Sequence, residues 1–458
     1  MEVSGDDIAR TVLEQFDRLP TKRKPQVRNE SLREWVPLSG IVAQGTDSLK
    51  CLALATGMKC LPQNKITQAK GLVLHDWHAE ILAIRSFNRF LLEECHALAR
   101  SGKQTSEYVR LRTAAEQSET HYQPFALNDG IQLHMYCSEA PCGDASMELT
   151  MASQEDSSPW ILPSHKPETK STPSSISGAV SPTSLTEASR LENLTTSTST
   201  LHGRGYFSEL GIVRRKPSRP DAPPTLSKSC TDKLSLKTST SLLSSLTSLL
   251  ILPSNCYLSS ITLPASQYSQ TACTRAFISR LAPLAAPDPS QSPRQQSSVT
   301  SLWEGGYRFQ PVQVKTTIHE FAFCRRLPEY GAAMQFVSSN LSAAWTPSGI
   351  EETVIGGVLQ GRKQFDVRGA SKLCKRRMWK LALEIAMLAT AASGAGAARR
   401  TQKQKQIQQT LQTPLYRDIK DSALLQARRR VKEDVRSLAL PGWVRNEDGD
   451  EFEISGVQ

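Results

Sequence analysis

The chain has 458 residues, of which 39% are hydrophobic and 22% charged, so it is not globally disordered and can form one large domain or two smaller ones. Its net charge of +11 indicates either a polyanionic partner such as a nucleic acid or simply a soluble basic surface, and the charge alone does not decide between them. No apolar run reaches the length of about 18 residues that a membrane span needs, and we expect no membrane association. Residues 1–7 are acidic and lack the apolar segment of a secretion signal, which predicts an intracellular protein of the nucleus, the cytoplasm or both.

Three stretches of the chain have the composition of inserts rather than of a packed core. Residues 151–200 are rich in Ser and Thr, which predicts a disordered loop. Residues 281–300 are rich in Pro and Ser and predict a linker, and residues 391–412 predict a flexible insert. No fixed-period repeat is present, which excludes solenoids and propellers, and we expect a single domain over residues 1–458.

Helical and strand patterns alternate between the inserts. Short β-branched or apolar runs predict strands at 40–42, 72–74 and 353–355. Apolar residues at helical spacing predict helices at 81–92 and 423–438. The mixture predicts an α/β or α+β domain and leaves its topology open.

The strongest local motif is His78-Ala79-Glu80, followed downstream by Pro141-Cys142. This order of residues is typical of zinc-dependent nucleobase deaminases. An imidazole and two thiolates can hold zinc tetrahedrally with one position left for water, and Glu80 would then move protons. Because residues two apart on a regular helix point to different sides, His78 and Glu80 can converge only where the helix begins, with Asp76 as the expected cap.

A third metal ligand is needed, and no cysteine follows Cys142 at the short Cys-x-x-Cys spacing. The better candidate is Cys230 in Ser-Cys-Thr-Asp-Lys, far along the chain. His-Ala-Glu, Pro-Cys-Gly-Asp-Ala and Ser-Cys-Thr-Asp-Lys, in this order, resemble the adenosine deaminases that act on RNA, and among them the eukaryotic tRNA-specific type. The resemblance covers most of the chain outside the inserts, from about residue 19 to Phe452.

The resemblance implies an α/β fold: a cytidine-deaminase-like mixed sheet flanked by helices, with a C-terminal extension that encloses a polyphosphate. It implies zinc on His78, Cys142 and Cys230, and Glu80 as the catalytic acid and base. The implied activity is hydrolytic deamination of adenosine to inosine in tRNA, at the adenosine 3′ of the anticodon in alanine tRNA.

The resemblance also implies inositol hexakisphosphate as a buried cofactor. On a helical wheel Tyr416, Lys420 and Arg430 share one face, and buried cations on that face would need an anion. The alternative is that Lys420 and Arg430 lie on a solvated, tRNA-facing surface. At Ile84, Leu236, Lys237 and Gln426 the sequence has other residues than those usual in the family, and these differences affect individual phosphate contacts. The implied polyphosphate residues are Arg85, Lys233, Lys375, Tyr416, Lys420, Arg430, Trp443 and Asp450.

The implied partner is tRNA, and no obligatory protein partner is evident. Lys59 and Lys216 are expected either to support the site from behind or to contact substrate phosphates. The family motifs begin within the first 40 residues, so we expect no duplex-RNA-binding domain before them. The alternatives are a duplex-RNA adenosine deaminase, a deaminase of free nucleosides, and an inactive relative that only binds RNA.

Overall fold

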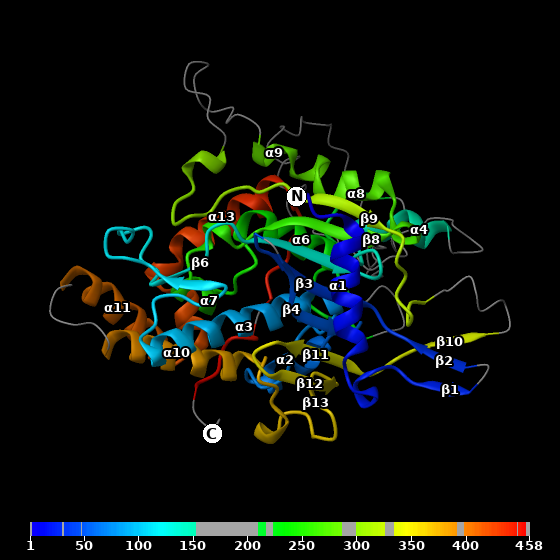
Figure 1. Ribbon diagram of the computed structural model, residues 1–458, viewed down its shortest axis with the longest axis horizontal. Coiled ribbons are helices and arrows are strands. Elements are labelled where there is room, and N and C mark those ends of the chain that lie inside the picture. The colour runs from blue at the N-terminus through cyan, green and yellow to red at the C-terminus, as the bar shows by residue number, and fades with distance from the viewer. Residues whose placement is uncertain are drawn as a thin grey trace, which may run out of the picture.

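The computed structural model describes residues 2–29, 32–46, 48–152, 209–216, 223–285, 299–325, 334–391, 398–446 and 448–454. Its centre is a mixed sheet of eight strands in the order β13-β12-β11-β4-β3-β7-β8-β9 (Figure 1). The central pairs β4–β3 and β3–β7 are antiparallel, whereas β7–β8 and β8–β9 are parallel. These strands are β3 (Leu38–Gln44), β4 (Leu49–Thr56), β7 (Gln132–Cys137), β8 (Leu258–Pro264), β9 (Gln313–Thr317), β11 (Ser342–Thr346), β12 (Ile350–Ile355) and β13 (Val358–Leu359).

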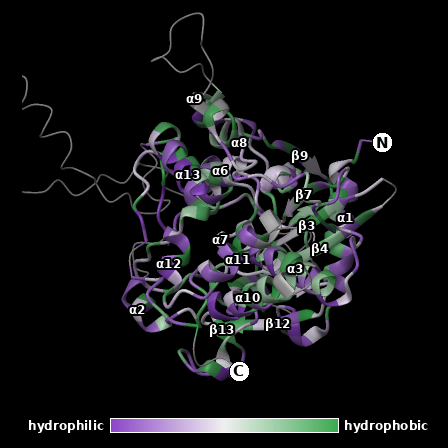
Figure 2. Ribbon diagram, turned by 90° about the vertical axis from the view of Figure 1, so that its left-hand side faces the viewer, coloured by the Kyte–Doolittle hydropathy of each residue, from purple (hydrophilic) through white to green (hydrophobic). Residues whose placement is uncertain are grey.

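Helices cover both faces of this sheet. Helix α1 (Gly5–Asp17) packs on β3 and β4 from one side. Helix α3 (Ala79–Ser101) packs on the same strands from the other side and carries α10 (Lys375–Ala391) on its outer surface. Because both faces are covered, β3 and β4 are almost continuously buried, and Figure 2 colours these strands largely as hydrophobic.

Two smaller sheets and a helical C-terminal part complete the fold. Strands β1 (Val27–Asn29), β2 (Leu32–Trp35) and β10 (Gln335–Ser338) form one sheet, and β5 (Val109–Leu111) pairs with β6 (Phe125–Leu127). The remaining helices are α2 (Ile66–Ala69), α4 (Met147–Ala152), α6 (Cys230–Thr240), α7 (Ser245–Leu250), α8 (Gln270–Phe277), α9 (Ala282–Ala285), α11 (Ala398–Leu411), α12 (Tyr416–Asp421) and α13 (Gln426–Leu438).

The structure confirms an α/β fold with a mixed sheet and the strands predicted at 40–42 and 353–355, which lie in β3 and β12. The strand predicted at 72–74 is wrong: this apolar run is a buried loop that packs in the core, where Leu74 N donates to Gly357 O. Among the described helices none is long and apolar enough to cross a membrane. A single domain over 1–458 stays a prediction.

Only parts of the three predicted inserts lie among the residues that the structure describes. Residues 153–208, which include most of the Ser/Thr-rich stretch, and residues 286–298 lie outside the described residues. At the start of the predicted linker, Leu281 and Leu284 are buried at helix α9. The insert predicted at 391–412 is corrected over α11, which is helical because Ile407 and Leu411 pack into the core while polar residues cover its outer side.

Helix α1 approaches the sheet at Gly40 of β3. A Cβ atom at Gly40 would lie 2.6 Å from Cγ1 of Val12, much closer than a normal contact. We therefore expect Gly40→Ala to lower the free energy of unfolding by about 1–3 kcal/mol, because α1 must move off the sheet. Urea unfolding measures this. Gly45→Ala is the matched control, since its Cβ would meet only Ser48 Oγ at 3.6 Å; equal stability of the two variants would contradict the packing.

Candidate active site

The predicted metal donors lie where three helices begin. His78 is the N-cap residue of α3, with extended backbone angles, and Glu80 follows in the first turn. Cys142 precedes the short 3-10 helix Asp144–Ser146, whose N-cap residue is Gly143 with φ of 109°. Cys230 is the first residue of α6. A helix N-terminus stabilises nearby negative charge, which favours a thiolate at Cys142, whose pKa lies well below its usual value.

Thr231 fixes the two cysteine segments together. Its Oγ1 donates to Pro141 O at 2.9 Å, and its backbone N donates to Cys142 O at 3.1 Å. The backbone N of Cys230 donates to Cys142 Sγ at 3.3 Å. A Cβ at Gly143 would lie 2.3 Å from Ser229 Oγ, so only glycine allows this close approach.

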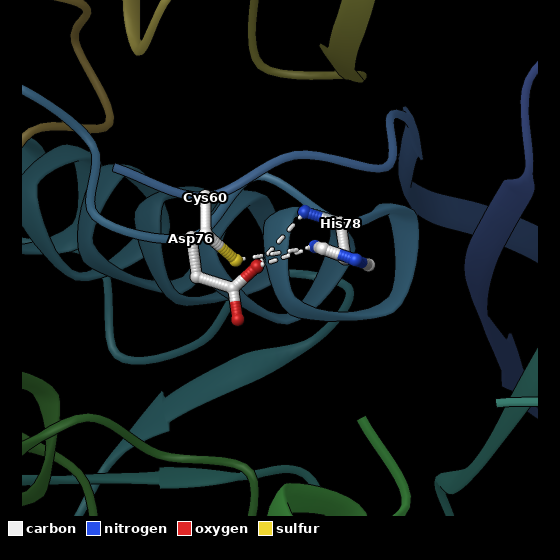
Figure 3. Close-up of side chains that lie close together, drawn as sticks. All are labelled: Cys60, Asp76 and His78. Carbon is white, nitrogen blue, oxygen red and sulfur yellow. Dashed lines mark hydrogen bonds and ion pairs between the residues drawn. The ribbon is translucent and has the colours of Figure 1, made fainter. Parts of the chain in front are cut away.

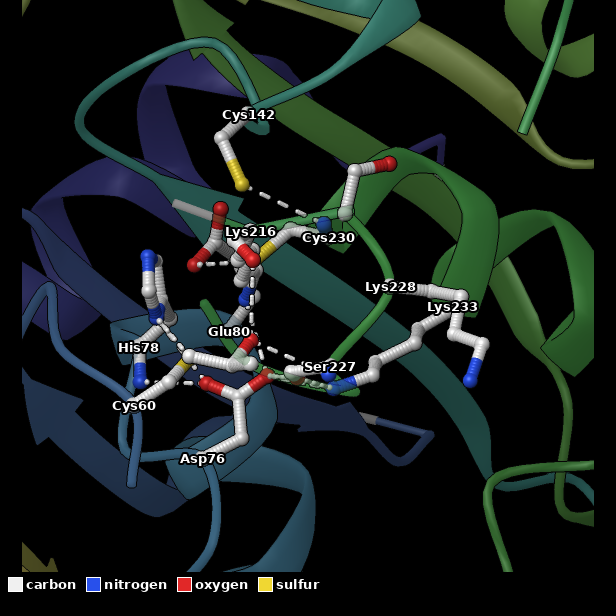
Figure 4. A network of polar contacts seen from close by, with 12 residues as sticks. Cys60, Asp76, His78, Glu80, Cys142, Lys216, Ser227, Lys228, Cys230 and Lys233 are labelled. Atoms are coloured by element: carbon white, nitrogen blue, oxygen red, sulfur yellow. Dashed lines mark hydrogen bonds and ion pairs between the residues drawn. The ribbon is translucent and has the colours of Figure 1, made fainter. Parts of the chain in front are cut away.

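Glu80 lies among these donors. Its side chain is buried, and Cys230 Sγ donates to Glu80 Oε2 at 3.2 Å. Figure 4 shows the side chains of His78 and Glu80, at the start of α3, on the same side as those of Cys142 and Cys230, which come from two other segments. Burial, and then the neighbouring Cys142, raise the pKa of Glu80, which suits a group that accepts and returns a proton near neutral pH.

Asp76 connects the histidine to two lysines. Its Oδ1 accepts hydrogen bonds from the backbone N of His78 at 3.0 Å and pairs with His78 Nδ1 at 2.9 Å. Its Oδ2 accepts from Lys216 Nζ at 2.8 Å, from Ser227 Oγ at 2.7 Å and from Lys233 Nζ. Burial alone would raise the pKa of Asp76, but Lys216 and Lys233 outweigh it and hold the pKa well below its usual value. Asp76 is therefore a buried carboxylate that orients His78, rather than the expected cap.

Lys216 links Asp76 to the cysteine pair. Its Nζ also donates to Cys230 Sγ at 3.1 Å. Burial opposes its charge, but Asp76 and Cys230 outweigh burial and raise the pKa of Lys216 well above its usual value. Hydrogen bonding from Cys230, helped by the charges of Lys216 and His78, lowers the pKa of Cys142 well below its usual value despite burial. Burial and the neighbouring Cys142 raise the pKa of Cys230 well above its usual value, so this pair holds negative charge at Cys142 and a thiol at Cys230.

Cys60, Asp76 and His78 form a second group of possible metal donors, all within 4.8 Å of one another (Figure 3). Cys60 Sγ lies 3.5 Å from His78 Nδ1. The Asp76 carboxylate in this group is already paired with two lysines, and it engages the Nδ1 side of the imidazole. A carboxylate on one ring nitrogen is the usual support for a histidine that binds metal through the other. This geometry favours the set His78, Cys142 and Cys230 over the Cys60 group.

Comparison with known proteins assigns the chain to a family. Residues 53–447 match the adenosine-deaminase (editase) domain. The chain belongs to the adenosine-deaminase (editase) family. It is 36% identical to tRNA-specific adenosine deaminase 1 of Schizosaccharomyces pombe over 82% of this chain and 84% of that protein. It is 30% identical to tRNA-specific adenosine deaminase 1 of Saccharomyces cerevisiae, over 53% and 54%. A Drosophila melanogaster double-stranded RNA-specific editase matches 31% of this chain and 20% of its own length at 27% identity.

The family assignment makes the chain an adenosine-deaminating enzyme. Most of the predicted polyphosphate residues lie in the C-terminal part of the chain. Lys375 and Lys420 both donate to the carboxylate of Asp450, the first at 2.7 Å. Tyr416 is buried and stacks on Phe452 with ring centroids 5.0 Å apart. Arg85 extends from α3 to Leu373 O at 2.9 Å, beside this group.

Arg430 does not belong to the buried face, so this prediction is corrected. Its side chain is exposed, whereas Arg428 is buried and donates to Thr240 O at 2.7 Å. The helical wheel failed because residues 416–430 are not one helix: α12 ends at Asp421, and Ser422 has extended backbone angles. Helix α13 therefore starts with a new phase, which turns Arg428 and Lys432 toward α6.

The structure also locates the other predicted residues. Trp443 is half-buried between Lys228 and Arg436, with cation-to-ring distances of 5.7 and 5.2 Å. Lys216 is buried beside Cys230 and Asp76, where it supports the site from behind, and its contact with substrate phosphates stays a prediction. Lys59 lies at the edge of the site, where Lys59 Nζ donates to Asn340 Oδ1.

Sequence reasoning missed several residues of the editase site. The roles of Ser227 and Thr231 depend on contacts across 151 and 90 residues of sequence separation, which no local pattern reveals. Lys233 was assigned to the polyphosphate but also pairs with Asp76. Arg428 had one available signal, the Ser422 break, because Ser often marks the boundary between helices.

The ion pairs of the buried Asp76 carboxylate should contribute to the stability of the fold. Asp76→Asn leaves Lys216 buried without its counter-charge, and we expect a loss of about 3–5 kcal/mol in the free energy of unfolding. Urea unfolding followed by circular dichroism measures it. The control is Asp129→Asn, whose side chain is 78% exposed and should change stability by less than about 1 kcal/mol. If Asp76→Asn cost no more than this control, Asp76 would not be the compensating charge.

Proposed function

We propose that this editase-family enzyme is a zinc-dependent hydrolase that converts adenosine to inosine in tRNA, at the adenosine 3′ of the anticodon in alanine tRNA. The observation that carries the proposal is the convergence of buried Glu80 with His78, Cys142 and Cys230. The names of the Schizosaccharomyces and Saccharomyces relatives support tRNA as the substrate. The net charge of +11 supports a polyanionic substrate in general.

The donor set fits zinc by its chemistry. One imidazole and two thiols from three helix starts would hold the ion, and Asp76 fixes the imidazole from behind. Zinc supplies Lewis-acid activation of water when it is bound. Glu80 is not needed as a ligand in this set, which leaves its carboxylate for proton transfer.

The chain's own residues perform the proton steps. Attack of water at C6 of the adenine requires a base, and Glu80 Oε2 accepts the proton of that water. As the C6–N6 bond breaks, Glu80 delivers the proton to the leaving amino group, so that ammonia departs and inosine remains. The buried surroundings that raise the pKa of Glu80 favour its protonated state between these steps.

Replacement of Glu80 tests this role. Glu80→Gln removes the proton carrier but keeps the shape of the side chain, so we expect tRNA deamination to fall by at least about 100-fold. Zinc content and tRNA affinity should remain. Inosine is measured by digestion of the tRNA and mass spectrometry, with Glu384→Gln as the control, because Glu384 is a half-exposed residue of α10 beside His96. Turnover by Glu80→Gln at the wild-type rate would contradict the assignment.

The choice of substrate separates this proposal from its alternatives. An alanine tRNA, its isolated anticodon stem-loop, a long RNA duplex and free adenosine are offered to the same wild-type preparation. We expect inosine in the intact tRNA, because an anticodon loop presents unstacked bases that are cheap to extrude. Inosine only in the duplex would favour a duplex-RNA editase, inosine only from free adenosine a nucleoside deaminase, and none in any substrate an RNA-binding relative.

We also propose inositol hexakisphosphate as a structural cofactor in the C-terminal part. Burial, and then the nearby Arg428, lower the pKa values of Lys237 and Lys432 well below their usual range. Within the described ranges, Arg428 Nε and Arg377 Nε are buried without a hydrogen-bond acceptor. Asp450 is the carboxylate that pairs with Lys375 and Lys420. This group of buried and partly buried cations fits a multivalent phosphate, held by Arg85, Lys233, Lys237, Lys375, Tyr416, Lys420, Arg428, Lys432 and Trp443.

Lys432→Gln tests whether the cations of the C-terminal part bind a polyphosphate, because the melting temperature should change in opposite directions with and without the ligand. With a polyphosphate bound, removal of this cation should lower the melting temperature by several degrees, because a buried anion loses a partner. Without one, removal of a repelled cation should raise it. Differential scanning calorimetry reports the sign, and exposed Lys405→Gln on α11 is the control. Mass spectrometry of the denatured wild-type protein should find inositol hexakisphosphate.

We further propose that the enzyme works inside the cell, in the nucleus, the cytoplasm or both, where its tRNA substrate is found.

A further inference from the structure

The small sheet β1-β2-β10 lies at the ends of two inner strands of the main sheet, because β2 leads into β3 and β10 leads into β11. Its strands lie apart from the main sheet in Figure 1, beyond α1. Two backbone hydrogen bonds hold its inner end: Val36 N donates to Phe323 O at 3.0 Å, and Ser339 N donates to Trp35 O at 2.9 Å. Leu38, three residues after the end of β2, pairs with Thr56 at the end of β4, and Ser138 N donates to Leu38 O. The sheet is therefore fixed beside the segments that lead to His78 and Cys142.

Side chains of this sheet and its flanks extend toward the catalytic residues. Lys59 precedes Cys60, the residue that contacts His78, and Lys59 O accepts from Trp77 N at 3.0 Å. Asn340, just after β10, accepts a hydrogen bond from Lys59 Nζ. On the other flank, Arg325 N donates to Glu139 Oε1 at 3.1 Å, three residues before Cys142. These contacts define the catalytic rim as Trp35, Lys59, Arg325 and Asn340.

Arg325 is the exposed cation of this rim. Its guanidinium lies 5.6 Å from the ring centroid of half-buried Trp35, a distance within the range of cation–π attraction. The ring restricts the exposed side chain of Arg325, so less side-chain entropy is lost when the guanidinium binds an anion. The neighbouring carboxylate of Glu34 is buried and accepts from Ser339 Oγ at 2.8 Å, so it is directed away from the solvent.

We propose that Arg325, positioned by Trp35, binds an RNA phosphate beside the target adenosine, together with Lys59 on the same rim. The inference rests on the proposed function, because it names the surface by which the deaminase holds tRNA. A base that is extruded into a buried site leaves its two flanking phosphates at the entrance, and cations at that entrance would fix them. Trp35 is a positioning residue: it holds the guanidinium and does not contact the reacting base.

The test measures tRNA affinity as a function of salt together with steady-state kinetics. Arg325→Gln should raise Kd and KM about 5- to 10-fold near 0.15 M salt and leave kcat within about 2-fold. It should also reduce the slope of log K against log salt by about 0.7, which corresponds to one lost phosphate contact on a single strand. Arg368→Gln is the matched control, because Arg368 is an exposed arginine, 79% accessible, on the turn after β13. Arg368→Gln should leave Kd, KM and the slope of log K against log salt unchanged.

Substitutions of Trp35 show whether the position of the Arg325 guanidinium matters for tRNA affinity apart from its charge. Trp35→Phe keeps an aromatic face and should retain nearly wild-type affinity, whereas Trp35→Leu should reproduce part of the Arg325→Gln effect at unchanged net charge. A wild-type chain that deaminates tRNA while Arg325→Gln keeps its Kd and salt slope would overturn this inference alone. A wild-type chain that neither binds nor deaminates tRNA would overturn the proposed function itself.

Discussion

The buried carboxylate of Asp76 is the constraint on which the site depends. An unpaired carboxylate in this position would be strongly disfavoured, and Lys216 and Lys233 make its burial possible. In return Asp76 holds the imidazole of His78, and Lys216 reaches on to Cys230. Segments that are far apart in the sequence are thus joined by charges that would be costly to separate.

Helix starts provide the second part of this arrangement. His78, Cys142 and Cys230 each lie at or just before a helix N-terminus, where the local field favours negative charge. The extended N-cap of α3 allows His78 and Glu80 to converge although they are only two residues apart. The main sheet and the helices on its two faces supply the rigid frame that holds these starts in place.

The sequence predicted the chemistry better than the contacts that support it. His78, Glu80 and Cys142 stand in short motifs, and Cys230 was located by its resemblance to a third, so the structure brings together residues that were already candidates. Asp76 was expected to cap a helix, because its position before α3 is local information, whereas its pairing with Lys216 and Lys233 depends on the fold. The helical wheel misplaced Arg430, because periodicity carries no information across the extended Ser422.

The most direct measurement is anomalous diffraction at the zinc absorption edge from crystals of the purified enzyme, because the central claim is that His78, Cys142 and Cys230 form one metal centre beside Glu80. The account predicts a single strong peak among these three side chains, on the side of the imidazole that faces away from Asp76. A peak among Cys60, Asp76 and His78 would contradict it, and would mean that Asp76 binds the metal instead of orienting its ligand.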